Sequence, residues 1–589
     1  MSKKRKTRMF NILLCIPPDY DRHFPPLGTP ALAAYLKKKG YACSQADLNV
    51  RYRDFLADHV SGPGALTGQE RLFFLQPLLT RFFAHCLKDR YYSGFLPVTS
   101  DRIFPHLPYG NNTNSSFYFC ERLLSSDLLW RYLDDRDENT FYRFFEQEGI
   151  IESLEKQDIR LFGISITSPS QAVAGLTLGL MVKSRCPHIH VTIGGQWPTL
   201  FRDVLFQRKD LFRCFDSVVV FEGETALYGL AKRLERGGHI SSIPNVITPD
   251  TVPANAPIRP EEDLNDLPCP DFDGLMLADY DGSKDGQISL TFETSRGCYW
   301  SKCAYCVDLP LPKPSYRVKS ANRIAQDMQE LKDRYNAQYL LFGDPGLSPR
   351  QMRQVSQQIL KDHIGMEWWT MARLDPGFDA ALFDLAHAAG LQQVNFGFET
   401  ASDRISRLLD KGNIRDRSSR IIRDCAAAGI KVDLQTMLGL PGETFEEGME
   451  TIDFLVSHRQ YISHVTFNTY YLTPGNHVYD TPGRYGIEYD KGAGLPFRFF
   501  IPFRNIHGID MEKADMLERM YYALMHKGDG AAAALEPAVP CHLSDGYADL
   551  TLPNGSYRLR YRRDPVTETY TFLDDGPESR ENVHAAAVR

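Results

Sequence analysis

Two runs of short apolar segments that alternate with helical segments constrain this chain most, because such alternation is typical of parallel sheets with helical crossovers. In the first run, the predicted strands cover residues 10–16, 161–167, 190–195 and 217–224, and helices are predicted over 30–39 and 171–184. In the second run, predicted strands cover 288–294, 338–344, 367–373, 393–399, 431–439 and 464–472. The second run predicts a parallel barrel or partial barrel, whose active site lies at the carboxyl ends of the strands.

The boundaries of these runs predict a domain organisation for the 589 residues. We expect an N-terminal α/β domain over 1–250, flavodoxin-like or Rossmann-like, with an aromatic-rich helical insertion at about 52–155. A linker rich in Pro and Asp follows over 251–284, and the partial (β/α)6 barrel covers 285–480. The remaining residues, 481–589, predict a small α+β region that caps the substrate, with an amphipathic helix at 510–527 and a hairpin turn at 553–555.

Composition excludes several classes of protein. The chain is 43% hydrophobic and 24% charged, with a net charge of −7, which gives no pull toward nucleic acid or an anionic membrane. No apolar run is long enough to span a bilayer, and the basic start MSKKRKTRMF lacks the apolar core of a signal peptide. The twelve cysteines are scattered except for one cluster, which favours a reducing cytoplasm. We therefore expect a cytoplasmic protein without a nucleic-acid or membrane partner.

The clustered cysteines directly follow the first strand of the second run. Residues 295–306 (SRGCYWSKCAYC) place Cys298, Cys303 and Cys306 in one loop. Three thiolates on a four-iron cluster leave one iron open to a substrate or cofactor. A structural zinc site is the alternative, but zinc would need a fourth ligand, and no histidine lies nearby.

This loop resembles the cluster-binding loop of the radical S-adenosylmethionine (SAM) superfamily, whose motif is Cys-x3-Cys-x2-Cys with an aromatic residue before the last cysteine. Tyr305 fills the aromatic position and Arg296-Gly297 match the usual lead-in, although the spacing here is Cys-x4-Cys-x2-Cys. The resemblance implies a [4Fe-4S] cluster on the three cysteines, within a domain of about residues 285–480.

The same resemblance implies SAM contacts at the ends of the later strands. It places the SAM amino group at Gly343 and Asp344, the carboxylate at Arg373, the ribose at Glu399 and the adenine beside Leu440. For Arg373 and Glu399 the alternative is a structural ion pair at the mouth of the barrel.

An α/β domain ahead of a radical SAM domain resembles the subgroup that binds cobalamin. The resemblance assigns cobalamin contacts to small or polar residues at strand ends, namely Pro25, Leu27, Ser165, Thr167, Ser168, Gly194, Gly195, Glu222, Gly223 and Glu224. His23 begins the pattern of a cobalt-ligating histidine, but Pro26 stands where that pattern has glycine, so we do not assign it as a ligand. The alternative is a flavodoxin-like domain that has lost its cofactor.

The resemblance implies a cobalamin-dependent methyltransferase that methylates an unactivated carbon of a natural product or peptide. Its expected partners are a small-molecule or peptide substrate and an electron donor such as flavodoxin or ferredoxin. A radical SAM reaction without methyl transfer, such as a rearrangement or ring contraction, is one alternative. The other is a corrinoid- or metal-binding regulatory module without turnover.

Overall fold

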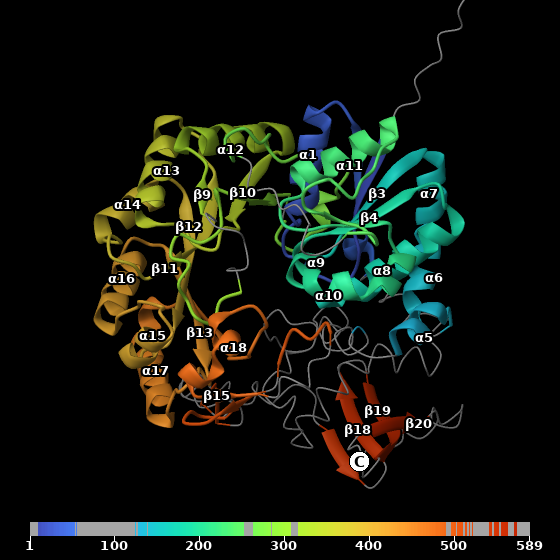
Figure 1. Cartoon of the computed structure of the whole chain (residues 1–589). Coiled ribbons are helices and arrows are strands. Elements are labelled where there is room, and N and C mark those ends of the chain that lie inside the picture. Colours follow the sequence, from blue (N-terminus) through green and yellow to red (C-terminus); the bar gives the residue numbers. More distant parts are fainter. Residues whose placement is uncertain are drawn as a thin grey trace, which may run out of the picture.

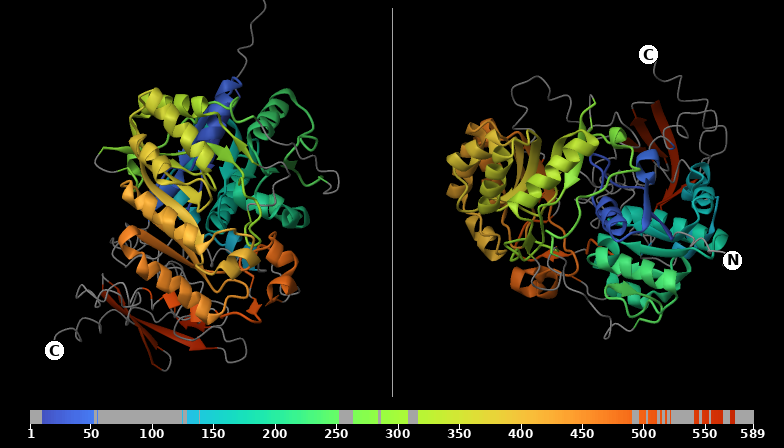
Figure 2. Two further views of the ribbon diagram at one scale, coloured as in Figure 1. Left: turned by 90° about the vertical axis from the view of Figure 1, so that its left-hand side faces the viewer. Right: turned by 90° about the horizontal axis from the view of Figure 1, so that it is seen from above.

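The computed structural model describes residues 10–52, 55, 124, 128–137, 139–251, 263–283, 286–307, 316–489, 496–501, 503–510, 513–514, 517–518, 521, 541–544, 547–552, 555–563 and 570–573. Two α/β units lie side by side in Figure 1, and Figure 2 shows the same division from two further directions. The expected insertion is described only in part. Its visible helices are α5 (Leu128–Asp134), α6 (Thr140–Gln147) and α7 (Ile150–Lys156), and residues 56–123 lie outside the described residues.

The N-terminal unit is built on a six-stranded sheet of order β2-β1-β3-β4-β5-β6. Its strands are β1 (Asn11–Ile16), β2 (Ala42–Asp47), β3 (Ile159–Ser165), β4 (His190–Gly194), β5 (Ser217–Val219) and β6 (Val246–Ile247). The first five are parallel and β6 pairs antiparallel with β5. The order 2-1-3-4-5 is that of flavodoxin-like folds, in which ligands bind at the carboxyl edge where the strand order reverses.

Helices cover both faces of this sheet. Apolar residues of α1 (Gly28–Lys38) and α11 (Glu224–Arg236) pack with Ile12, Leu14 and Leu161 in one core. The opposite core contains α8 (Pro169–Arg185) and α5 to α7 against the other side of the strands. Short helices α9 (Gln196–Leu200) and α10 (Arg202–Gln207) follow β4.

The second unit is a parallel sheet of order β14-β13-β12-β11-β10-β7, so its strands follow one another in chain order and form an open half-barrel. The strands are β7 (Ile288–Phe292), β10 (Ala337–Phe342), β11 (Glu367–Arg373), β12 (Leu391–Glu399), β13 (Lys431–Leu438) and β14 (His464–Thr469). All neighbouring pairs are parallel.

The helices of the second unit lie on the outer face of the half-barrel (Figure 1). They are α12 (Ala321–Tyr335), α13 (Pro349–Lys361), α14 (Ala380–Ala388), α15 (Asp403–Leu408), α16 (Arg415–Ala427) and α17 (Phe445–Ser457). In α12, buried Ile324, Met328 and Leu331 recur at helical spacing, Ser320 caps the start, and Asn336 ends the helix with a φ of +53°. The α/β fold class predicted from the sequence, with a flavodoxin-like sheet and a partial parallel barrel, is confirmed.

Two smaller elements complete the described fold. The connecting segment 263–283 packs between the units, and Asp271 within it contacts Lys37 at 2.9 Å and Arg334 at 2.9 Å. Toward the C-terminus, α18 (His477–Asp480), β15 (Ile487–Glu488) and β16 (Arg504–Asn505) precede an antiparallel sheet of β17 (Cys541–Ser544), β18 (Tyr547–Leu552), β19 (Gly555–Arg563) and β20 (Tyr570–Leu573). Of the expected turn at 553–555, residues 553–554 lie outside the described residues, and Gly555 pairs with Leu552. Within the part of the chain that the structure describes, no helix is both long and apolar enough to cross a membrane.

Candidate active site

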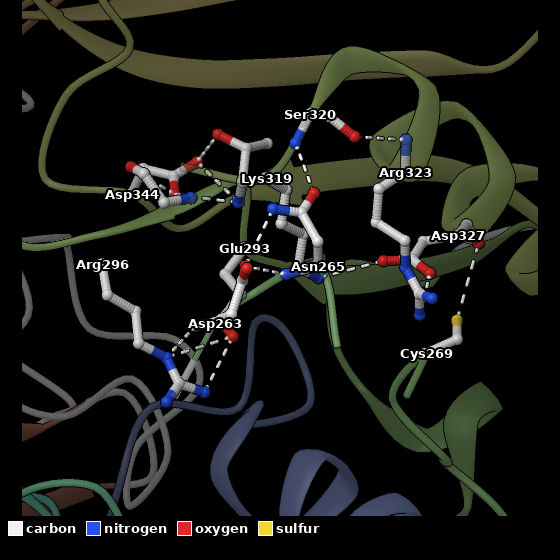
Figure 3. Close-up of polar contacts among 12 residues, drawn as sticks. Asp263, Asn265, Cys269, Glu293, Arg296, Lys319, Ser320, Arg323, Asp327 and Asp344 are labelled. Atoms are coloured by element: carbon white, nitrogen blue, oxygen red, sulfur yellow. Dashed lines mark hydrogen bonds and ion pairs between the residues drawn. The ribbon is translucent and has the colours of Figure 1, made fainter. Parts of the chain in front are cut away.

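The cysteine loop begins after β7 and is anchored by Asp344, which follows β10. Thr294 donates to the Asp344 carboxylate from its backbone N at 2.9 Å and its Oγ1 at 2.8 Å, and Ser295 Oγ donates at 3.0 Å (Figure 3). Burial raises the pKa of Asp344 to about 6, although these hydrogen bonds oppose the rise. The carboxylate is therefore engaged in holding the loop, and its expected contact with the SAM amino group stays a prediction. Gly343 beside it is exposed.

A two-stranded hairpin frames the same loop. Strand β8 (Ser295–Arg296) lies just before Cys298 and pairs antiparallel with β9 (Arg317–Val318), which follows the loop. Trp300 Nε1 donates to the Asp410 carbonyl at 2.7 Å, and Ala304 N donates to the Leu409 carbonyl at 2.9 Å. These contacts hold the loop against the segment that follows α15.

The three cysteines of the loop carry thiols in different environments. Cys303 is buried, whereas Cys298 and Cys306 are half-buried. Burial raises the pKa of Cys303, Lys411 and Arg373 oppose the rise, and Cys298 lies close enough to contribute. Within the described ranges, no group of three His, Cys, Asp or Glu side chains is gathered closely enough to hold a metal ion. The donor set nevertheless fits a cluster with three protein ligands, because soft thiolates in one loop are the ligands that iron–sulfur clusters use.

Arg373, at the end of β11, is directed at this loop. Its Nη1 lies 3.6 Å from Cys303 Sγ, and its guanidinium lies 4.3 Å from the centre of the Trp300 ring. Asp375 accepts from Arg373 Nε at 3.0 Å and from Nη2 at 3.2 Å. The structural ion pair weighed for Arg373 is thus present, with Asp375 as its partner, while Nη1 points to the cysteine loop.

Glu399 ends β12 and is paired with a residue that the sequence did not single out. Lys411 Nζ lies 2.8 Å from Glu399 Oε1, whereas Glu399 Oε2 is buried without a hydrogen-bond partner. The Glu399 backbone has a φ of +63°, which is a strained conformation for a residue with a side chain and is found most often at functional sites. A buried carboxylate oxygen without a donor fits a ligand hydroxyl at this position.

Tyr305 and Leu440, both expected near SAM, belong to one apolar cluster. Leu440 is fully buried and Tyr305 packs at the edge of the same cluster. Asn476 Nδ2 donates to the Tyr305 carbonyl at 3.0 Å, which ties the cysteine loop to the start of α18. Glu443 holds the turn around Leu440, because its Oε2 accepts from Gly439 N at 2.7 Å and from Leu440 N at 3.2 Å. Burial raises the pKa of Glu443 to about 8.

Sequence reasoning missed Trp300 and Lys411. Trp300 lies inside the cysteine motif, so its position was visible, but its stacking on Arg373 depends on a loop contact. Lys411 comes from the loop after α15, where no spacing rule relates it to Glu399. Both residues become functional candidates only through tertiary contacts.

The predicted cobalamin residues gather at the carboxyl edge of the N-terminal sheet, because they follow β1, β3, β4 and β5. Pro25 and Glu224 are buried. The other predicted residues are half-buried, namely Leu27, Ser165, Thr167, Ser168, Gly194, Gly195, Glu222 and Gly223. Gly195 has a φ of +108°, and a Cβ there would lie 2.4 Å from the Ile166 carbonyl oxygen, so only glycine fits.

Hydrogen bonds fix the loops of this edge to one another. Ser168 caps α8 in a capping box with Gln171. Gln171 Nε2 donates to the Pro17 carbonyl at 2.8 Å, and Ser170 Oγ donates to the Asp19 carbonyl at 2.6 Å. The loops after β1 and β3, which flank the switch point of the sheet, therefore form one rigid surface.

This edge faces the half-barrel. Gly282 N donates to the His23 carbonyl at 2.7 Å, and the rings of Phe24 and Trp369 of β11 are 6.4 Å apart. Glu224 and Glu222 form ion pairs at 2.6 Å and 3.1 Å with Arg296. Arg296 belongs to the β8–β9 hairpin that frames the cysteine loop, called the cysteine hairpin below. The two glutamates expected to contact cobalamin are therefore bonded to the other unit, and their contact with cobalamin stays a prediction.

Comparisons with known proteins agree with this geometry. The family model of the Radical SAM superfamily matches residues 292–455. An uncharacterized methyltransferase of Pyrococcus horikoshii is 25% identical over 309 residues, which cover 52% of this chain and 66% of that protein. The chain thus spans just under two thirds of that relative.

Two solved structures share the fold. The radical SAM methyltransferase TsrM of Kitasatospora setae, solved with cobalamin and a [4Fe-4S] cluster, matches with a TM-score of 0.58 and 14% identity over 89% of this chain and 92% of that chain. The cobalamin-dependent radical enzyme OxsB with aqua-cobalamin matches with a TM-score of 0.57 and 13% identity over 87% of this chain and 66% of that chain. The protein described here therefore carries a domain of the radical SAM superfamily, within a fold that these two enzymes share.

Proposed function

We propose that this chain is a radical SAM methyltransferase with three cofactor sites. A [4Fe-4S] cluster would be held by Cys298, Cys303 and Cys306, with SAM at the mouth of the half-barrel. Cobalamin would lie on the carboxyl edge of the N-terminal sheet. The observation that carries the proposal is that this edge faces the half-barrel and that Glu222 and Glu224 beside it contact the cysteine hairpin. The fold that the chain shares with TsrM and OxsB supports it.

When bound, the cluster and cobalamin supply electron transfer to SAM and methyl transfer, which amino-acid side chains cannot provide. The side chains of the protein bind SAM and orient it. Arg373 would bind the SAM carboxylate through Nη1, while Asp375 and Trp300 hold the guanidinium in place. Glu399 would accept from a ribose hydroxyl at Oε2, its unpartnered oxygen. Tyr305 and Leu440 would line the adenine.

The side chains of the N-terminal edge have a different task. Small or polar residues such as Ser165, Thr167 and Gly194 leave backbone accessible to a flat ring and its nucleotide tail. His23 is exposed at this edge, and we do not propose it as a ligand of the cobalt. The acceptor would be an unactivated carbon of a small molecule or peptide, in the cytoplasm, with flavodoxin or ferredoxin as electron donor.

The test is anaerobic reconstitution of the full chain with iron, sulfide and cobalamin, followed by a SAM cleavage assay with a chemical reductant. We expect about four irons and one corrinoid per chain, and 5′-deoxyadenosine or S-adenosylhomocysteine as product. Absence of both products from a fully loaded protein would contradict an enzymatic function and favour a regulatory module. Deoxyadenosine formation with no methylated product, once an acceptor is found, would favour a radical reaction without methyl transfer.

A further inference from the structure

The contact between the two units at the cysteine hairpin is a compact cluster of charges. Arg296 of β8 contacts Glu222 at 3.1 Å, Glu224 at 2.6 Å and Glu293 at 2.9 Å. Arg317 of β9, paired with Arg296 across the hairpin, also forms an ion pair with Glu222. Both strands that frame the cysteine loop are thereby bonded to the loop that follows β5, and Figure 3 shows Arg296 against Glu293.

These charges are largely withdrawn from solvent. Only 4% of the Glu224 side chain is exposed, and the corresponding values are 17% for Arg296 and 20% for Glu222. Breaking a buried pair is strongly destabilising because it leaves an uncompensated charge, whereas the net contribution of the intact pair to stability is small. The best-attested role of such a network is to fix one relative position of the two parts that it joins.

The glutamates are themselves held rigidly. Glu224 is the first residue of α11, where the positive end of the helix favours a carboxylate. Phe221, just before them, has a φ of +60° and donates its backbone N–H to Thr199 Oγ1 at 2.9 Å. A displacement of this edge of the N-terminal sheet would therefore be passed to Arg296, two residues before Cys298.

We propose that Glu222 and Glu224, with Arg296 and Arg317, form an interdomain clasp that sets the position of the cysteine loop relative to the carboxyl edge of the N-terminal sheet. In this contact the four side chains act as positioning residues, a role separate from the predicted contact of Glu222 and Glu224 with cobalamin. The inference rests on the proposed function only in taking the loop as the cluster site and the sheet edge as the corrinoid site. The position of the cysteine loop matters because reacting atoms must be held at short range. A misplacement of about 1 Å can lower the reaction rate 100-fold.

The first arm of the test needs no cofactor. Hydrogen exchange is measured by mass spectrometry on apoprotein for wild type, Glu224→Gln and the double variant Glu222→Gln/Glu224→Gln. We expect exchange in residues 288–307 and 217–224 to rise about tenfold in the glutamine variants, with α13 to α17 unchanged. The matched control is Glu488→Gln in the exposed pair with Arg504, which should change neither segment.

The second arm measures position directly. Protein loaded with cluster and cobalamin is brought to the [4Fe-4S]⁺ and cob(II)alamin states, which both carry unpaired electrons, and pulsed electron paramagnetic resonance measures the distance between the two centres. We expect one narrow distribution in wild type and Glu488→Gln, and a broadened or shifted one in Glu224→Gln, all compared at equal iron and corrinoid content. An unchanged distribution, or an exchange rise across the whole chain, would overturn the clasp. Failure of wild type to load would contradict the proposed function, while the exchange arm would still test the clasp.

Discussion

The carboxyl edges of the two parallel sheets differ in the chemistry that they offer. The edge of the half-barrel is charged, with Arg373 paired to Asp375 and Lys411 paired to Glu399, all nearly buried. The switch point of the N-terminal sheet is built from neutral groups such as Ser170 and Gln171, whose side chains donate to backbone carbonyls. Charged side chains are buried only when paired, so the half-barrel edge suits the charged ligand proposed for it, whereas the switch point of the N-terminal sheet offers neutral groups and the nearby Glu222 and Glu224 are paired with Arg296.

The largest effect that distinguishes the two sheet edges is expected when the cysteines of the loop at the half-barrel edge are replaced. Cys298→Ala, Cys303→Ala and Cys306→Ala should each abolish cluster assembly and SAM cleavage, because two thiolates hold a four-iron cluster poorly. Iron and sulfide analysis with electronic spectra measures this. Cys425→Ala is the control, since Cys425 is buried in the core of the half-barrel and burial raises its pKa. A triple variant that still bound four irons would refute the cluster assignment.

Arg373 tests whether the charged edge binds SAM. A charge-assisted hydrogen bond contributes about 1.5–3 kcal/mol, so Arg373→Ala should weaken SAM binding roughly tenfold to 150-fold in anaerobic calorimetry. Arg373→Lys should restore only part of the affinity, because a point charge cannot keep both the Asp375 contact and the ligand contact. Corrinoid binding should be unchanged. A variant that loses thermal stability but binds SAM normally would make the pair with Asp375 purely structural.

Gly195 tests whether the carboxyl edge of the N-terminal sheet binds the corrinoid. Gly195→Ala places a methyl group against the Ile166 carbonyl in a backbone region unfavourable to alanine, which should cost about 1–3 kcal/mol of stability. Corrinoid binding should weaken while iron content is preserved. Gly237→Ala is the matched control, since Gly237 has a φ of +71° with no atom within 4 Å of the added carbon. Equal effects of both substitutions on corrinoid binding would show that backbone strain alone is responsible.

Glu443 predicts a pH dependence for the charged edge. Its pKa is about 8 in the folded chain and about 4.3 in an unfolded one, so the fold favours the protonated form. The stabilisation is complete below about pH 4.3 and is lost as the pH rises through about 8, by about 1.4 kcal/mol for each unit of the pKa difference. Glu443→Gln, which stays neutral, should lose less stability than wild type between pH 5 and pH 9 in denaturant titrations. Parallel curves for the two proteins would contradict the raised pKa.

The smallest effect is expected at His23. His23→Ala should leave the spectrum of bound corrinoid unchanged, because the histidine is exposed and packs against Phe24. A clear spectral change would mean that this edge supplies a cobalt ligand, and the view of it as a neutral surface would then be wrong.

Much of the fold could be predicted from the sequence because most strands are short segments with β-branched and aromatic residues that alternate with helical segments. The predicted strands at 367–373 and 393–399 correspond to β11 (Glu367–Arg373) and β12 (Leu391–Glu399), with similar ends. Strand β2 (Ala42–Asp47), of sequence ACSQAD, was missed because it lies at the edge of its sheet and contains no β-branched or aromatic residue. Hairpin β8–β9 was also missed, since two-residue strands carry no periodic signal.

The order of the elements, the three-cysteine loop and the strand ends at which polar residues gather all follow from the amino-acid sequence, because each is a local property of residues close together in the chain. Which charges meet follows from the tertiary packing. It paired Arg373 with Asp375, Glu399 with Lys411, and Glu222 and Glu224 with Arg296. The physical reason is that an ion pair between distant segments depends on how whole units pack, and no spacing along the chain encodes that contact.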